Sequence, residues 1–450
     1  MKGRFSLLMV VLALMLALTA VVPVFAQDPI EIPVWIAFTD DSRLGWAQAK
    51  AAEFNTLFPQ YNVTITGYPN YEEIFTSTAL AAEQGSLPAI VQWNEVSTQI
   101  ARDSGYYKAI AEALGDRTEV NGVPFNLDDI VGPVAAYYTL DGQFSSMPWN
   151  ASSAIMFSNM SYLDAAGIDT PPATWAEMDA ACEAIMALDT APAYCWTWPN
   201  HGWFFEQWLA QQDGLYANNG NGRDDRATEV EFGGDAGLAV FDFLEDQYNK
   251  GYLYYSGARD GGSWSTVDQA FGAQEVAMAI YSSSDTTYYT QMGVDNGFEV
   301  VASFMPYNDA TGWTGNLIGG ASLWLVGGLP AEQEDGALTF LAWFTNTENS
   351  ADWHQRTGYI PLRNSSVDLL TSEGWFEENP NQTVAFDQLN TSTVTPATAG
   401  ALVGPINAIR SQITSAIDTL LLSDTASADV MAQLVSEANS QIEEYNLLNQ

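Results

Sequence analysis

The chain has 450 residues, of which 47% are hydrophobic and 12% aromatic, a composition that excludes a disordered acidic chain. It carries 55 acidic and 14 basic side chains, and the formal net charge of −41 makes nucleic acid and anionic membrane surfaces poor partners. Because one hydrophobic core seldom serves a chain of this length, two lobes are expected.

The N-terminus has the features of an export signal. Lys2 and Arg4 precede an apolar run over residues 5–22, and residues 24–26 (Val-Phe-Ala) offer a cleavage site. The run is long enough that an uncleaved anchor stays open. No cysteine follows it, which excludes lipid attachment there. We expect a signal peptide over residues 1–26 and an extracytoplasmic protein, in the periplasm or at the cell surface.

Strand and helix patterns alternate in the first part of the remaining chain. The expected strands are residues 32–38, 63–68 and 89–93, and helical patterns follow the first two. This order predicts a parallel sheet with crossover helices, in which ligands bind at the carboxyl ends of the strands. Tyr71 and Glu95 fall at such ends.

A crossing between the lobes is expected near Trp149. Small polar residues surround Pro148 and Trp149, and the apolar run 154–157 follows. This mixture suits a small polyol or sugar-like ligand, although an ordinary loop before a strand is an alternative. Residues 358–362 suggest a second crossing. We place the first lobe at residues 27–148 with about 310–360, and the second at 149–309 with about 361–450.

Two tryptophans are candidate ligand contacts. Trp175 begins a helix in which Thr174 and Glu177 form a capping box, so packing on its own turn is the alternative. Trp203 follows Gly202 in an aromatic cluster, which suits either a core or a loop that presents a ring to solvent.

Cys182 and Cys195 are the two cysteines of the chain. In an exported protein their spacing makes them candidates for one local disulfide, and the sequence leaves the pairing open. The polar segment 218–225 has some likeness to calcium ligands but lacks the regular alternation and the final glutamate of such a site. We therefore expect a turn there, and neither a metal nor a cofactor.

Five segments together carry a family resemblance. They are residues 67–72 (GYPNYE), 92–96 (QWNEV), 147–152 (MPWNAS), 318–324 (IGGASLW) and 353–361 (WHQRTGYIP). In this order and spacing the chain resembles the extracytoplasmic solute-binding proteins of ABC importers, most of all the members that bind glycerol-3-phosphate. The resemblance implies an α/β, two-lobed periplasmic-binding-protein fold of type II, with a mixed sheet flanked by helices in each lobe and a hinge between them.

The same resemblance implies a set of ligand contacts and a partner. The residues that match the family's contacts are Tyr71, Glu95, Ser152, Ser282, Gly320, Tyr359 and Arg410, with Trp175 as an aromatic wall. Glu95 suits glycerol hydroxyls, and Arg410 suits a phosphate, with an ordinary ion pair as its alternative. The protein would act as a monomer and hand its ligand to a membrane permease. Trp149 and Ala151 depart from the family's usual phenylalanine and serine, which puts the pocket's shape in doubt.

Two other functions stay open at this point. The tryptophans and the acidic balance would suit a receptor for a neutral sugar or oligosaccharide. A secreted glycoside hydrolase would need two carboxylates facing each other across a cleft. The acidic pairs 40–41 and 224–225 are adjacent in sequence, which does not indicate that arrangement. The expected function is binding without catalysis.

Overall fold

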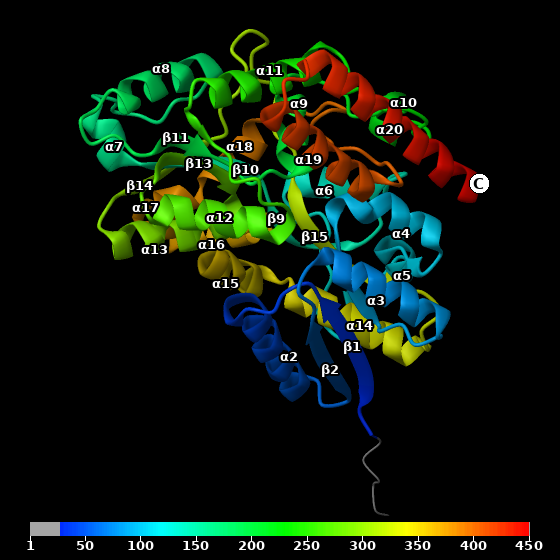
Figure 1. The fold of residues 1–450 in the computed structure, drawn as a ribbon. Coiled ribbons are helices and arrows are strands. Elements are labelled where there is room, and N and C mark those ends of the chain that lie inside the picture. Colours follow the sequence, from blue (N-terminus) through cyan, green and yellow to red (C-terminus); the bar gives the residue numbers. More distant parts are fainter. Residues whose placement is uncertain (1–27, 450) are drawn as a thin grey trace, which may run out of the picture.

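Two mixed β-sheets, each covered by helices, make up the structure. The computed structural model describes residues 28–449, and its two halves lie in the lower and upper parts of Figure 1. The predicted signal segment, residues 1–26, lies outside the described residues.

Six strands form the first sheet. They are β1 (Ile30–Ile36), β2 (Tyr61–Gly67), β3 (Ile90–Asn94), β4 (Tyr107–Lys108), β9 (Met147–Ser152) and β15 (Gly319–Val326). Their order is β2-β1-β3-β15-β4, and β9 also pairs with β15. β1 pairs in parallel with β2 and with β3. The helices α2 (Trp46–Leu57) and α3 (Tyr71–Glu83) connect the three strands, which confirms the predicted parallel arrangement. We use the name first lobe for this sheet with α2, α3, α4 (Thr98–Ser104), α5 (Ile110–Leu114) and α14 (Ala331–Phe344).

Five strands form the second sheet. They are β10 (Ala154–Asn159), β11 (Tyr194–Thr197), β12 (Leu253–Tyr254), β13 (Val276–Ser282) and β14 (Val300–Phe304), in the order β12-β11-β13-β10-β14. Every residue of β10 and β13 is buried, because helices cover both faces of these central strands. We use the name second lobe for this sheet with α7 (Met160–Ala165), α8 (Trp175–Met186), α9 (Gly202–Gln211), α10 (Asn218–Gly222), α11 (Asp235–Asn249), α12 (Asp260–Gly272), α13 (Thr286–Asn296), α18 (Val384–Thr391), α19 (Ile406–Leu422) and α20 (Ser427–Leu448).

The remaining elements are short or lie between the lobes. The helices are α6 (Gly132–Tyr138), α15 (Thr347–Thr357), α16 (Asn364–Ser372) and α17 (Trp375–Glu378). The short helical turns are η1 (Asp41–Gly45), η2 (Glu95–Ser97), η3 (Ser283–Asp285) and η4 (Pro380–Gln382). Two small hairpins pair β5 (Glu119–Val120) with β6 (Val123–Pro124) and β7 (Thr139–Leu140) with β8 (Gln143–Phe144).

The chain passes from the first sheet to the second at Ser153, the single residue between β9 and β10. Residues 150–152, which the sequence predicts in the second lobe, pair with β15 in the first sheet. The strand is polar enough to look like a loop, yet all of its residues are buried. The segment predicted as a second crossing lies beside the first, where the N–H of Ile360 donates to the carbonyl of Ala151 at 2.8 Å. The lobe boundaries are otherwise a prediction.

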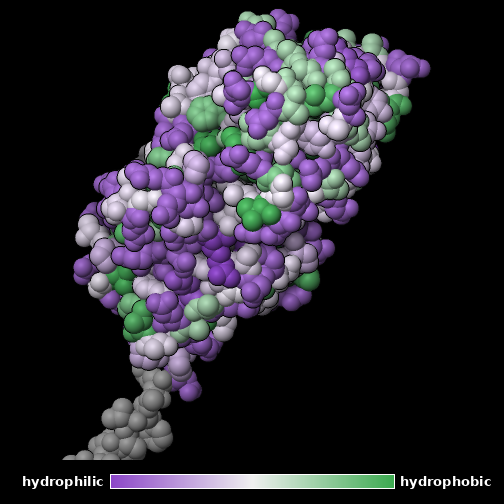
Figure 2. Space-filling model, turned by 90° about the vertical axis from the view of Figure 1, so that its left-hand side faces the viewer, coloured by the Kyte–Doolittle hydropathy of each residue, from purple (hydrophilic) through white to green (hydrophobic). Residues whose placement is uncertain are grey.

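The surface reflects the acidic composition. The face in Figure 2 is largely hydrophilic, with apolar spots that are small and separate. Within residues 28–449, no helix combines the length and the apolar character that a bilayer crossing requires.

A disulfide joins the second sheet to one of its covering helices. Cys182 of α8 and Cys195 of β11 are bonded and fully buried, with Cα atoms 5.4 Å apart. The two cysteines are 13 residues apart in sequence, so the bond closes a short loop that includes the end of α8. It therefore fixes this helix end onto the sheet.

Removing this bond should lower the stability of the protein. A Cys182→Ala/Cys195→Ala double variant is expected to lose about 3 kcal/mol of unfolding free energy, because the unfolded chain regains the freedom that the loop closure removes. Denaturant unfolding measures the loss. Wild-type protein under reducing conditions is the control, since it keeps both sulfur atoms, and it should shift in the same direction. A reduced protein as stable as the oxidised one would contradict this role.

Candidate functional site

The predicted ligand residues gather where strand ends of both sheets meet the crossing strand β9. Tyr71 begins α3 just after β2, and Glu95 directly follows β3. Ser152 ends β9, and Ser282 ends β13 in the second sheet. Ligands of open α/β sheets bind at such carboxyl ends.

Gly320 brings two strands unusually close. It lies opposite Ala151 in the pairing of β15 with β9, and its neighbour Gly319 lies opposite Ser152. Its φ is +99°, and a Cβ atom there would lie 1.7 Å from the carbonyl oxygen of Asn150. Only glycine can occupy this position without moving the backbone, which leaves the peptide groups of β15 uncovered by a side chain.

Tyr71, which is half-buried, and Tyr359, which is buried, flank Asn150. The side-chain amide of Asn150 donates to the Tyr71 hydroxyl at 3.1 Å and accepts at 2.9 Å from the amide of Gln92. The ring of Tyr359 stacks on Trp353, with centroids 5.5 Å apart. Burial raises the pKa of the Tyr71 and Tyr359 hydroxyls, so both are neutral and able to donate hydrogen bonds at physiological pH.

An ion cluster connects the two lobes at the other end of the site. Arg410 of α19 donates to Glu95 of the first lobe at 2.8 Å. It also forms a two-pronged pair with Glu206 of α9, at 2.6 and 2.9 Å. All three side chains are buried, with residue exposures of 3% for Glu95, 5% for Glu206 and 6% for Arg410.

The cluster holds two carboxylates and one guanidinium. Burial lowers the pKa of Arg410, but the charges of Glu206 and Glu95 outweigh it and hold that pKa above its usual range. Burial also raises the pKa of Glu95, and the nearby Glu206 adds to the rise while Arg410 opposes it. His201 adds no positive charge at neutral pH, because burial and the charge of Arg410 lower its pKa to about 3. This end of the site therefore favours hydroxyl donors over an anion.

The two predicted tryptophans lie in different places. Trp203 is in the first turn of α9 and is buried, so the interpretation of an exposed loop ring is wrong: α9 begins one residue earlier and is buried along its whole length. Its indole N–H donates to the carbonyl of Ile318 at 3.4 Å, which puts its ring against Gly319 at the edge of the site.

Trp175 lies in the core of the second lobe. Its ring stacks on Phe243 at 4.4 Å. Half of the predicted capping box forms: the Thr174 hydroxyl accepts from the N–H of Glu177, but the Glu177 carboxylate accepts from the N–H of Ala173 and not from that of Thr174. None of the contacts found in the described residues joins Trp175 to the Glu95 and Arg410 cluster, so packing is the role that its position supports.

Four residues of the site were not predicted from the sequence as ligand contacts. Glu206 could have been found as the lone charge in an otherwise uncharged, aromatic helix, GWFFEQWLAQ. Asn150 lies within a motif of the resemblance. Arg43 and Asp285, which pair across the lobes at 2.5 Å, follow strand ends in short helical turns and leave no distinct signal in the sequence.

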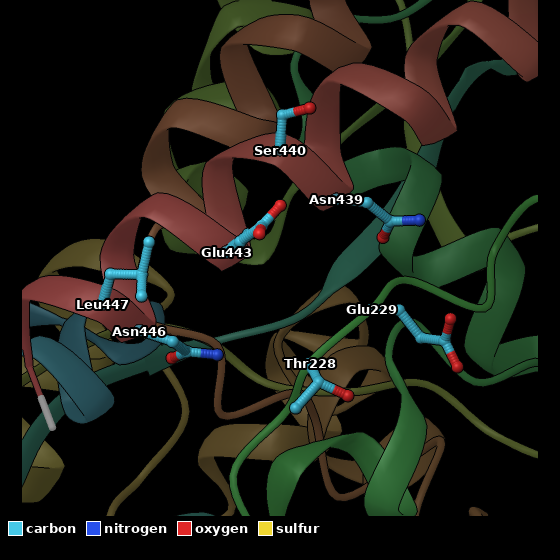
Figure 3. A pocket seen from close by; sticks show the side chains of 7 residues that line it. All are labelled: Thr228, Glu229, Asn439, Ser440, Glu443, Asn446 and Leu447. Atoms are coloured by element: carbon cyan, nitrogen blue, oxygen red, sulfur yellow. The ribbon is translucent and has the colours of Figure 1, made fainter.

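Three other features of residues 28–449 were candidates for a site. Among residues 28–449, no three histidine, cysteine, aspartate or glutamate side chains are grouped so as to hold a metal. The segment with some likeness to calcium ligands is a left-handed turn, in which the Asn221 side chain accepts from the N–H groups of Tyr216 and Ala217. Figure 3 shows an open surface pocket of about 400 Å³ between α20 and residues 228–229. None of the predicted ligand residues lines it.

Comparisons with known proteins find a matching family and similar folds. Residues 49–384 match the family model described as bacterial extracellular solute-binding protein. The sn-glycerol-3-phosphate-binding periplasmic protein UgpB of Salmonella typhimurium is 29% identical over 397 residues, which cover 86% of this chain and 87% of that protein.

Two solved structures are similar in fold. UgpB from Mycobacterium tuberculosis, in complex with glycerophosphocholine, has a TM-score of 0.75 at 21% identity and covers 93% of this chain and 99% of its own. The cyclic alpha-maltosyl-1,6-maltose binding protein from Arthrobacter globiformis has a TM-score of 0.73 at 20% identity and covers 92% of this chain and 100% of its own. The predicted two-lobed fold is confirmed.

Proposed function

Since the chain belongs to the family of bacterial extracellular solute-binding proteins, we propose that it captures sn-glycerol-3-phosphate or a glycerophosphodiester outside the cytoplasm. The substrate-binding component of an ABC importer hands its ligand to a membrane permease and leaves it chemically unchanged. The relatives named for sn-glycerol-3-phosphate and the complex with glycerophosphocholine support this ligand class.

The observation that carries the proposal is the division of the site into two unlike ends. At one end, Glu95 presents a buried carboxylate that can accept from the hydroxyls of a glycerol unit. At the other, Ser152, Ser282 and the tyrosine hydroxyls are uncharged donors beside the glycine-lined edge of β15. Ser282 also caps η3, the turn that leads into α13, where helix N–H groups favour an anion.

This division changes the role that we give to Arg410. The family resemblance implies a phosphate at its guanidinium, but two carboxylates already bind it within 2.9 Å. A phosphate would have to compete with both. We therefore place the phosphate among the serine and tyrosine hydroxyls, and let Arg410 hold Glu95 in position for the glycerol end.

Titration calorimetry tests the proposal. Wild-type protein should release or absorb heat on binding glycerol-3-phosphate or glycerophosphocholine, and should show little response to glycerol alone, which lacks the phosphate. An absence of binding to every phosphorylated glycerol would overturn it.

A neutral sugar is the second candidate ligand. The excess carboxylate in the cluster of Glu95, Glu206 and Arg410 favours it, since sugar hydroxyls can donate to both acids without meeting charge repulsion. The similarity in fold to a maltosyl-maltose binding protein is compatible with it. Maltose and cyclic oligosaccharides belong in the same titration series, and binding to these alone would select this candidate.

A further inference from the structure

A second arginine lies at the hydroxyl-rich end of the site. Arg43 is in η1, after β1 of the first lobe, and its Nη2 lies 2.5 Å from Oδ1 of Asp285 in η3 of the second lobe. Both turns follow strand ends, as Tyr71 and Glu95 do. The pair therefore crosses between the lobes on the side where a ligand of this fold is expected.

The surroundings of Arg43 connect it to the predicted contacts. Its guanidinium carbon lies 5.9 Å from the centroid of the Tyr359 ring and 5.4 Å from that of Phe38. Burial raises the pKa of the Tyr71 hydroxyl, and the positive charge of Arg43 acts against that rise, as it does at Tyr359. Arg43 is thus close to both tyrosines that flank Asn150.

Arg43 has donor capacity left over. Its carboxylate contacts are Asp285 at 2.5 Å and the looser Asp40 at 4.0 Å. Its Nε–H is buried and has no hydrogen-bond partner among the described residues. Arg410, by contrast, uses both Nε and Nη2 on carboxylates. A guanidinium has five N–H donors in a fixed fork, which matches the oxygens of a phosphate.

We propose that Arg43 is a ligand-binding residue that takes the phosphate of a glycerol phosphoester, in competition with the carboxylate of Asp285. The assignment rests on the proposed function and adds a cation to a site whose other contacts at this end are uncharged. Asp285 then acts as a stand-in for the ligand's negative charge. Its second oxygen accepts from the Ser284 hydroxyl at 2.7 Å, so the carboxylate is held in place beside the arginine.

The alternative is a latch, in which Arg43 and Asp285 serve only to join the lobes. The two roles predict different effects of Asp285→Asn on ligand affinity. A latch is broken equally from either side, so Arg43→Gln and Asp285→Asn would weaken ligand binding alike. If Asp285 competes with the phosphate, its replacement removes a competitor and leaves the affinity unchanged or raised, while loss of Arg43 lowers it.

Titration calorimetry with glycerol-3-phosphate separates these outcomes. Arg43→Gln should weaken binding at least about tenfold, the usual effect of losing a hydrogen bond to a charged group. Asp285→Asn should bind as tightly as wild type or more tightly. Arg102→Gln is the matched control, because Arg102 pairs with the exposed Asp141 within the first lobe, and it should change nothing.

Two results would overturn the assignment. One is wild-type affinity in Arg43→Gln, and the other is a tenfold or greater loss in Asp285→Asn, which decides the matter even if Arg43→Gln fails to fold. If wild type binds no phosphorylated glycerol at all, the proposed function falls and this inference with it. If wild type binds and the variants behave as a latch, the inference about Arg43 alone fails.

Discussion

Arg410→Ala is expected to destabilise the protein by about 3–5 kcal/mol, the usual cost of removing one partner of a buried ion pair. The reason is that Glu206 and Glu95 would be left buried without a counter-charge, both at 5% exposure or less. Ligand affinity should fall as well, by about 2 kcal/mol or more, since Glu95 loses the group that orients it. That is a loss of about thirtyfold.

Denaturant unfolding and titration calorimetry measure the two effects. Arg356→Ala is the matched control, because Arg356 is on the surface and donates only to the carbonyl of Ser42 among its described hydrogen bonds. It should leave both quantities nearly unchanged. Wild-type stability in Arg410→Ala would mean that the cluster is not buried as the structure has it.

Gly320→Ala is expected to disrupt the site and lower stability by about 3 kcal/mol or more, from a strained positive φ and from overpacking. The new Cβ would lie 1.7 Å from the carbonyl oxygen of Asn150, so β9 and β15 would have to separate. The strand β9 carries Ser152 and Asn150, and both would shift. Binding should therefore be lost along with stability.

Gly327→Ala, directly after the far end of β15, provides the comparison. A Cβ there meets nothing closer than 3.5 Å, and its φ is not in the left-handed region. Thermal unfolding of both variants should show a large drop for Gly320→Ala and little change for Gly327→Ala. Equal melting temperatures would contradict the close approach of the two strands.

Much of the fold follows from local patterns in the sequence. The strand and helix order of residues 32–93 predicts the parallel half of the first sheet, and the structure has it. The Thr174 side chain also caps its helix as predicted. These features depend on residues that are neighbours along the chain, so one sequence is enough to reveal them.

The crossing strand β9 is harder to predict from the sequence, because its residue types do not indicate a buried strand. The residues of β9, Met-Pro-Trp-Asn-Ala-Ser, look like a loop, yet all are buried. Hydrogen bonds from Gln92 and to Tyr71 satisfy its Asn150, and both partners come from distant segments. Such partners leave no local pattern, so composition alone does not show that residues 150–152 pair within the first sheet.

The candidate site shows the same limit. Glu95 and Arg410 are 315 residues apart in sequence, and only the fold brings them together. The family resemblance predicts both residues as ligand contacts, but it implies that Arg410 binds the phosphate of the ligand. Glu206, in helix α9 of the second lobe, changes that interpretation. It adds a second carboxylate to the one that already contacts Arg410.

A crystal structure of the protein with glycerol-3-phosphate is the most direct test of the central claim, that a phosphorylated glycerol lies between the lobes. We expect the phosphate within hydrogen-bond distance of Ser152, Ser282 and the β15 edge at Gly320, and a glycerol hydroxyl at Glu95. A ligand bound outside this site, in the surface pocket beside α20 for example, would contradict the account.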